Sequence, residues 1–151
     1  MDIEKRLKTT QKLPPSKKVA LNLLIASTAI NDSMSEILKP FAISAPQFNV
    51  LRILRGQKGK PANLETIQTR MIHKMSNTTR LVDKLLEKKL VERVVCEENR
   101  RKVEITITEK GLEMLRKMDP LVDGVNQQIE QQFSAEEMDQ LNFLLEKIQK
   151  T

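Results

Sequence analysis

The fold is decided by residues 74–111, which read KMSNTTRLVDKLLEKKLVERVVCEENRRKVEITITEKG. In the first half, apolar residues recur at steps of three or four, the spacing of one face of a helix. In the second half, Val103, Ile105 and Ile107 alternate with polar residues, which is the two-residue period of a half-buried strand. The stretch therefore predicts a helix from near residues 74–76 to 89, followed by a β-hairpin with strands at 91–95 and 103–107.

Three helices are predicted before this stretch, over about residues 16–39, 45–56 and 63–70. The residues that start or end them are Ser16, Pro40, Ser44 in a capping box with Gln47, Gly56, Gly59 and Asn63. Residues 1–15 are polar and end in two prolines, so we expect a loose arm there.

Two helices are predicted after the hairpin, over about residues 108–132 and 134–149. Thr108 and Ser134 are their expected N-caps. Pro120 and Gly124 should bend or interrupt the first of them. The whole chain is thus expected to form one domain, residues 1–151, that is mainly α with a small β-hairpin.

The basic residues are concentrated in the middle of the chain. Residues 58–102 hold 12 Lys and Arg against 6 Asp and Glu, a net charge of +6, which equals that of the whole protein. Residues 1–57 carry +5 and residues 103–151 carry −5. A local basic surface indicates a polyanionic partner, although a charged solvated face is the simpler explanation when charge is considered alone.

The order of the elements favours the polyanion. Two helices joined by a tight turn and followed by a basic hairpin form a winged helix-turn-helix, here residues 44–108. Long helices at 16–40 and 109–149 flank it and carry more apolar positions than one small lobe can cover. Exposed apolar surfaces of that extent mark interfaces, so these helices are predicted to form the dimerisation frame of a homodimer.

The predicted helix at 74–89 has a polar face opposite its apolar one. A B-DNA major groove admits one helix, whose N-terminal turns meet the base edges. Asn suits adenine, Arg suits guanine and Ser suits either, whereas Lys and Thr suit phosphates. The DNA contacts predicted on this helix are Ser76, Asn77 and Arg80 to bases, and Lys74, Thr79 and Lys84 to phosphates. On the hairpin, Asn99, Arg100 and Arg101 are predicted contacts, because a hairpin arginine can enter the narrow minor groove.

In residues 79–93 and 99–111 the chain resembles the MarR family (multiple antibiotic resistance regulators). The family's wing carries Asp-Arg-Arg and then Leu-Thr, and Asn99-Arg100-Arg101 and Ile107-Thr108 hold those places here. The resemblance implies a two-fold dimer, a recognition helix at 74–89, and Arg101 as the arginine in the minor groove. It also implies a small effector, often aromatic or anionic, bound between the dimer helices and the DNA-binding lobe.

Three positions depart from the family pattern. Asn99 replaces the Asp that orients the wing arginine, which removes charge assistance from that pair. Lys74 stands where the family has a small hydroxyl cap, so the cap of the recognition helix is either Ser76 or missing. Lys89 stands where a glycine often follows the recognition helix, and this could shift the last helical turn.

Other classes of protein find little support in the sequence. A single His73 and a single Cys96 cannot form a zinc site, and no cofactor or metal is expected. Because no set of catalytic residues is visible either, the chain is predicted not to be an enzyme. One cysteine fits a reducing cytoplasm, and Cys96 is expected to have no redox role. No apolar run reaches the ~18–20 residues of a membrane span. The methionines at 71, 75, 114, 118 and 138 are expected to fill the core and interfaces.

The sequence therefore predicts a cytoplasmic transcriptional regulator that binds double-stranded DNA sequence-specifically. We expect a ligand-responsive repressor that acts as a homodimer on a palindromic operator. The alternative is a winged-helix module that binds another protein and has no DNA role. Positive charge on the recognition helix and wing would serve no purpose in such a module, which favours DNA binding.

Overall fold

The computed structural model of the chain describes residues 3–95 and 103–149. It confirms the predicted fold class, since helices dominate and the strands form one small antiparallel sheet. The elements in chain order are α1 (Ile3–Arg6), α2 (Pro15–Leu38), the 3-10 helix η1 (Lys39–Phe41), α3 (Ala45–Gly56), β1 (Ala62–Asn63), α4 (Leu64–Arg70), α5 (Thr78–Glu87), β2 (Val91–Val95), β3 (Val103–Ile107), α6 (Glu109–Glu130) and α7 (Ala135–Gln149).

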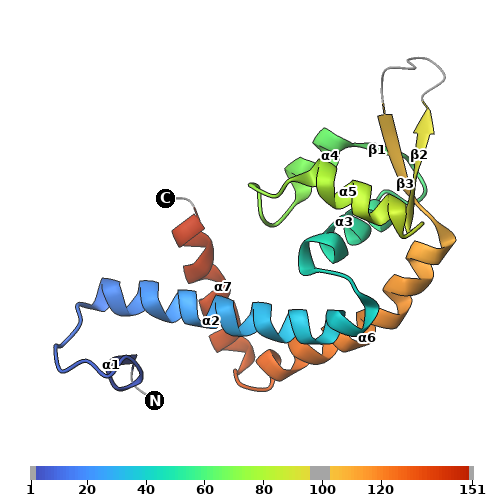
Figure 1. The fold of residues 1–151 in the computed structure, drawn as a ribbon. Helices are drawn as coiled ribbons and strands as arrows, with labels where there is room; N and C mark the ends of the chain where they lie inside the picture. Colours follow the sequence, from blue (N-terminus) through green and yellow to red (C-terminus); the bar gives the residue numbers. More distant parts are fainter. Residues whose placement is uncertain (1–2, 96–102, 150–151) are drawn as a thin grey trace.

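The molecule has two parts, a helical frame and a lobe (Figure 1). Helices α2 and α6 pack against each other in the frame, and α7 follows α6 at its far end. The lobe contains α3, α4, α5 and the sheet, and the β2–β3 hairpin projects from it away from the frame (Figure 1). No helix in the part of the chain that the structure describes is both long enough and apolar enough to cross a membrane.

One hydrophobic core joins the lobe to the frame. Within the lobe it consists of fully buried side chains from α3, α4, α5 and β3, namely Leu51, Leu54, Ile67, Leu85 and Ile105. Leu38 at the end of α2 and Leu115 and Met118 on α6 belong to the same buried cluster. The lobe is therefore packed directly onto the ends of two frame helices.

The predicted hairpin is confirmed residue by residue. Strands β2 and β3 pair antiparallel from Val91 opposite Ile107 to Val95 opposite Val103. A third strand, β1, pairs Ala62 with Ile105 on the other side of β3. The sequence does not predict β1, because two residues are too few to show an alternating pattern.

The N-terminal segment differs from the prediction, and α6 shows what the proline inside it does. The loose arm predicted over residues 1–15 contains α1, which Glu4 secures by accepting hydrogen bonds from the Leu13 amide and the Lys18 ammonium, both at 2.8 Å. Helix α2 begins at Pro15 rather than after a Ser16 cap, since proline at the first helical position already has a helical φ. Helix α6 continues through Pro120 and curves along its length (Figure 1), so of the two predicted outcomes the helix bends and is not interrupted.

A close backbone contact holds α6 against the end of α5. The Leu90 carbonyl accepts a hydrogen bond from the Thr108 amide at 3.1 Å, and the Thr108 hydroxyl caps α6 by accepting from the Gly111 amide at 3.1 Å. Gly111 itself is buried against the Leu90 carbonyl. A Cβ at this position would collide with that oxygen and would lie 2.7 Å from Ile107 Cγ1, so the contact requires glycine.

We therefore expect Gly111→Ala to lower the free energy of unfolding by at least about 1–3 kcal/mol, the usual cost of overpacking, because a backbone oxygen cannot move aside easily. Gly56→Ala is the matched control, since nothing lies within 4 Å of a Cβ at Gly56, the exposed last residue of α3. Urea denaturation followed by circular dichroism measures both. Equal stability of the two variants would contradict this account of the junction.

Candidate DNA-binding site

The recognition helix starts later than the sequence predicts. Helix α5 begins at Thr78, and its N-cap is Asn77, whose Oδ1 accepts a hydrogen bond from the Arg80 amide at 3.0 Å. The expectation that Ser76 caps the helix, or that the cap is missing, is therefore wrong. Ser76 instead donates its amide to the His73 carbonyl at 3.1 Å within the turn. Lys74 and Ser76 thus lie in the turn that precedes α5 and not in the helix.

The polar face of α5 is presented to solvent as predicted. Thr79, Arg80 and Lys84 are exposed, while Thr78, Val82 and Leu85 are buried against the lobe. Beside this face lies an open hollow of about 380 Å³, lined by Pro46, Ser76, Asn77, Arg80, Leu81 and Lys84. The structure therefore brings four of the predicted contacts to one hollow at the start of the helix.

The turn before α5 is held by Gln68 of α4. Its side-chain amide donates to the Lys74 carbonyl, and its carbonyl oxygen accepts from the buried Thr78 hydroxyl. The Lys74 ammonium donates to the Thr69 carbonyl, so its predicted phosphate contact would require it to leave this position. Sequence reasoning did not find Gln68, because its role depends on two residues that lie six and ten positions away.

The end of α5 accommodates the lysine that stands in place of a glycine. Lys89 has φ of 60°, in the left-handed region, and the helix keeps its closing hydrogen bonds, Lys89 N–H to Leu86 O at 2.9 Å and Leu90 N–H to Leu85 O at 3.0 Å. The expected shift of the last turn does not occur. The cost is instead backbone strain, because side chains with a Cβ disfavour this conformation.

An ion pair that the sequence does not predict joins the recognition helix to the wing. Arg93 of β2 donates from Nη2 to Asp83 Oδ1 of α5 at 2.7 Å. Both side chains are about half exposed, so the pair adds little to overall stability. It lies where the first wing strand, β2, passes the recognition helix, α5. The predicted wing contacts Asn99, Arg100 and Arg101, and Cys96, lie outside the described residues and remain predictions.

A helix held at a fixed angle to a hairpin, with basic and hydrogen-bonding side chains on its open face, defines a winged helix-turn-helix of the DNA-binding class. Comparison with known proteins identifies the protein family. The sequence profile of the MarR family matches residues 43–103. The chain belongs to the MarR family of transcriptional regulators and is a DNA-binding regulator, not an enzyme.

Two curated relatives and one solved structure show the extent of the similarity. The transcriptional repressor IacR of Pseudomonas putida is 28% identical over 76% of this chain and 67% of that protein. The regulator MhqR of Bacillus subtilis is 30% identical over 70% of this chain and 71% of that protein. The structure of BpsR from Bordetella bronchiseptica, whose DNA binding is regulated by 6-hydroxynicotinic acid, aligns with a TM-score of 0.80 at 21% identity, covering 93% of this chain and 99% of that one.

The role of Asn77 can be separated into cap and base contact by two substitutions. Asn77→Ala removes the cap and is expected to cost about 1 kcal/mol of unfolding free energy, whereas Asn77→Ser keeps a capping oxygen and most of that stability. If capping is the whole role, Asn77→Ser binds operator DNA as tightly as the parent. A loss of operator affinity in the stable Ser variant would show that the amide also contacts a base.

Proposed function

We propose that the protein is a homodimeric, ligand-responsive repressor that reads a palindromic operator with α5 and the wing. The observation that carries the proposal is the set of exposed polar residues on the open face of α5, next to the hairpin. The relatives are bacterial regulators, one of them named a repressor, and bacterial DNA lies in the cytoplasm. We therefore also propose a cytoplasmic location.

Exposed apolar side chains on the helical frame support the proposed dimer. Helix α7 carries the apolar side chains Met138, Leu141, Leu144, Leu145 and Ile148, yet none of its residues is buried within the protomer. An apolar groove of about 510 Å³ lies between α2, α6 and α7. Leu23 and Ile30 line it from α2, and Ile129 from α6. The protomer leaves much of the apolar face of α2 exposed. A second copy packed in this groove would cover that face.

We expect Leu141→Asp to dissociate the dimer, because it places a carboxylate inside the groove where a partner would remove it from water. Gln140→Asp adds the same charge to the neighbouring exposed position and should leave the dimer intact. Sedimentation at micromolar concentration measures the difference, with the parent at about twice the chain mass. A monomeric, folded parent protein would contradict the dimer and the palindromic operator together.

Arg80 and Arg101 are proposed to have different roles. If Arg80 makes a paired contact with guanine, Arg80→Ala costs about 1–3 kcal/mol of operator binding and relaxes selectivity at one position in each half-site. Arg101→Ala weakens binding to operators generally, most where the flanking DNA is A·T-rich and its minor groove narrow. Titrations on operator and scrambled duplexes at fixed salt measure both. Parental affinity of both variants for both duplexes would refute the assignment.

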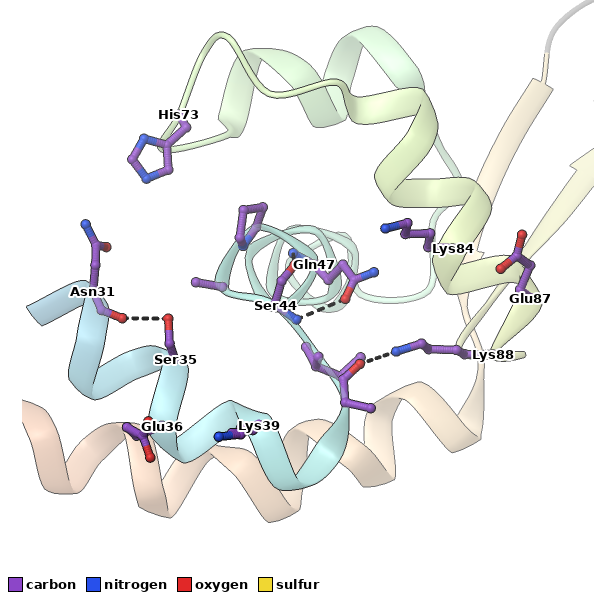
Figure 2. Close-up of a pocket in the computed structure, with 14 residues that line it drawn as sticks. Asn31, Ser35, Glu36, Lys39, Ser44, Gln47, His73, Lys84, Glu87 and Lys88 are labelled. Carbon is purple, nitrogen blue, oxygen red and sulfur yellow. Dashed lines mark hydrogen bonds between the residues drawn. The ribbon is translucent and has the colours of Figure 1, made fainter. Parts of the chain in front are cut away.

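A cleft between frame and lobe supports a ligand response. It has a volume of about 970 Å³ and is open to solvent. Figure 2 shows Asn31 and Ser35 of α2 and Lys39 of η1 on one side of the cleft. His73 of the turn, Lys84 of α5 and Lys88, the C-cap of α5, lie across it. Glu36 and Glu87 also line the cleft, so basic side chains outnumber acidic ones. A small organic acid bound there would contact both the frame and the recognition helix.

We expect 6-hydroxynicotinic acid, or a related aromatic acid, to weaken operator binding by the parent protein. Lys39→Ala should raise the acid concentration needed, because it removes a cation from the frame wall of the cleft without touching α5. Lys17→Ala, at an exposed position on α2 that does not line the cleft, is the control. The measurement is fluorescence anisotropy of labelled operator during titration with acid. Identical responses of the two variants would exclude Lys39 from the ligand site.

A further inference from the structure

The turn before the recognition helix exposes a methionine almost completely. The side chain of Met75 is 97% exposed, whereas Met71, four residues earlier, and Met118 are both buried in the core. Met75 therefore does not fill the core of the protomer, and its predicted place in an interface remains a prediction. Met75 is also the most exposed of the large apolar side chains in residues 3–95 and 103–149. Single exposed apolar side chains are common on protein surfaces, so the position of Met75 in the fold decides what it contacts.

The position of Met75 indicates what that partner is. Met75 lies two residues before Asn77, the N-cap of α5, and directly before Ser76. Ser76, Asn77 and Arg80 line the hollow at this end of the helix. In helix-turn-helix proteins the N-terminal end of the recognition helix is the part that meets base edges in the major groove. Met75 therefore lies beside the predicted base-contacting residues, at the end of α5 that is expected to enter the major groove.

The major groove offers one apolar group to such a side chain. Among the four bases only thymine presents a methyl group there, while the other functional groups are hydrogen-bond donors and acceptors. The neighbouring Ser76, Asn77 and Arg80 are suited to donors and acceptors, and none of them is suited to a methyl group. A methionine is unbranched, flexible and polarisable, so it can adapt to a small apolar target.

We propose that Met75 contacts the C5-methyl group of one thymine in each operator half-site and thereby contributes to sequence preference. The inference rests on the proposed operator-binding function. A second apolar residue of the turn, Ile72, is 78% exposed but lies at the end nearer α4, where its amide is tied to Asn49 Oδ1 at 3.0 Å. Ile72 is therefore a matched control for Met75: it is an exposed apolar residue of the same turn that lies farther from the start of α5.

Replacement of thymine by deoxyuridine tests the contact directly, because it removes the methyl group and leaves base pairing unchanged. An operator is first selected from random duplex DNA with the parent protein, and each thymine is then replaced in turn. For the parent we expect one position in each half-site where the replacement weakens binding about fourfold, the effect of uncovering one methyl-sized group. At that position Met75→Ala should be insensitive to the replacement, whereas Met75→Leu should remain sensitive.

The variants also distinguish the alternatives. Because Met75 is almost fully exposed, Met75→Ala should unfold at the parental temperature, which excludes a folding defect as the cause of weaker binding. Ile72→Ala should keep the parental sensitivity to deoxyuridine. The inference is overturned if no thymine in the operator is sensitive to replacement by deoxyuridine, or if Met75→Ala retains that sensitivity. It is also overturned if Met75→Ala weakens binding to all duplexes equally, or if Ile72→Ala is the variant that loses the sensitivity. Failure to select any operator would overturn both the proposed function and this inference, whereas a selected operator without coupling overturns only the inference.

Discussion

The contact between Gly111 and the carbonyl oxygen of Leu90 is the constraint on which the rest of the structure depends. Leu90 is the residue that closes the end of the recognition helix and leads into the first wing strand. Gly111 lies in the first turn of α6, directly after the second wing strand. The absence of a side chain at this point lets the two backbones touch. Recognition helix, wing and frame therefore meet at a single place.

Hydrogen bonds near this contact connect the end of α5 to α6 on one side and to the segment after α2 on the other. On the α6 side, the Thr108 hydroxyl donates to the Lys89 carbonyl and the Lys110 ammonium donates to the Lys88 carbonyl, both at 2.9 Å. On the α2 side, the Lys88 ammonium donates to the carbonyl of Ala42, in the connection between η1 and α3. The C-terminal end of α5 is thus bonded to both flanks of the lobe. These bonds connect the end of the recognition helix to the start of α6 and to the segment that follows α2.

The sequence was sufficient for most of the fold because most elements carry a local signal. The capping box of Ser44 with Gln47 and the Asn63 cap appear in the structure as predicted. The strand predicted at 103–107 also forms, although Ile105 is the only one of its alternating apolar residues that is buried. The missed features depend on contacts between distant residues. Gln68 sets the start of α5 through Lys74 and Thr78, and Arg93 reaches Asp83 across a helix and a strand. For the site, the sequence predicted the polar residues that α5 exposes, but it did not show that the side-chain oxygen of Asn77 caps that helix or that Met75 is almost fully exposed within the protomer.

The distribution of charge complements this rigid arrangement. The net positive charge resides in the first two thirds of the chain, whereas residues 103–151, which contain α6 and α7, carry −5. Most of that acidic stretch belongs to the frame, and the basic residues of the turn and of α5 lie on the lobe. The basic lobe therefore attracts a polyanion more strongly than the acidic C-terminal helices do. Because α5 packs against β2, an approach that brings the basic lobe to the duplex also brings the N-terminal end of α5 to the groove.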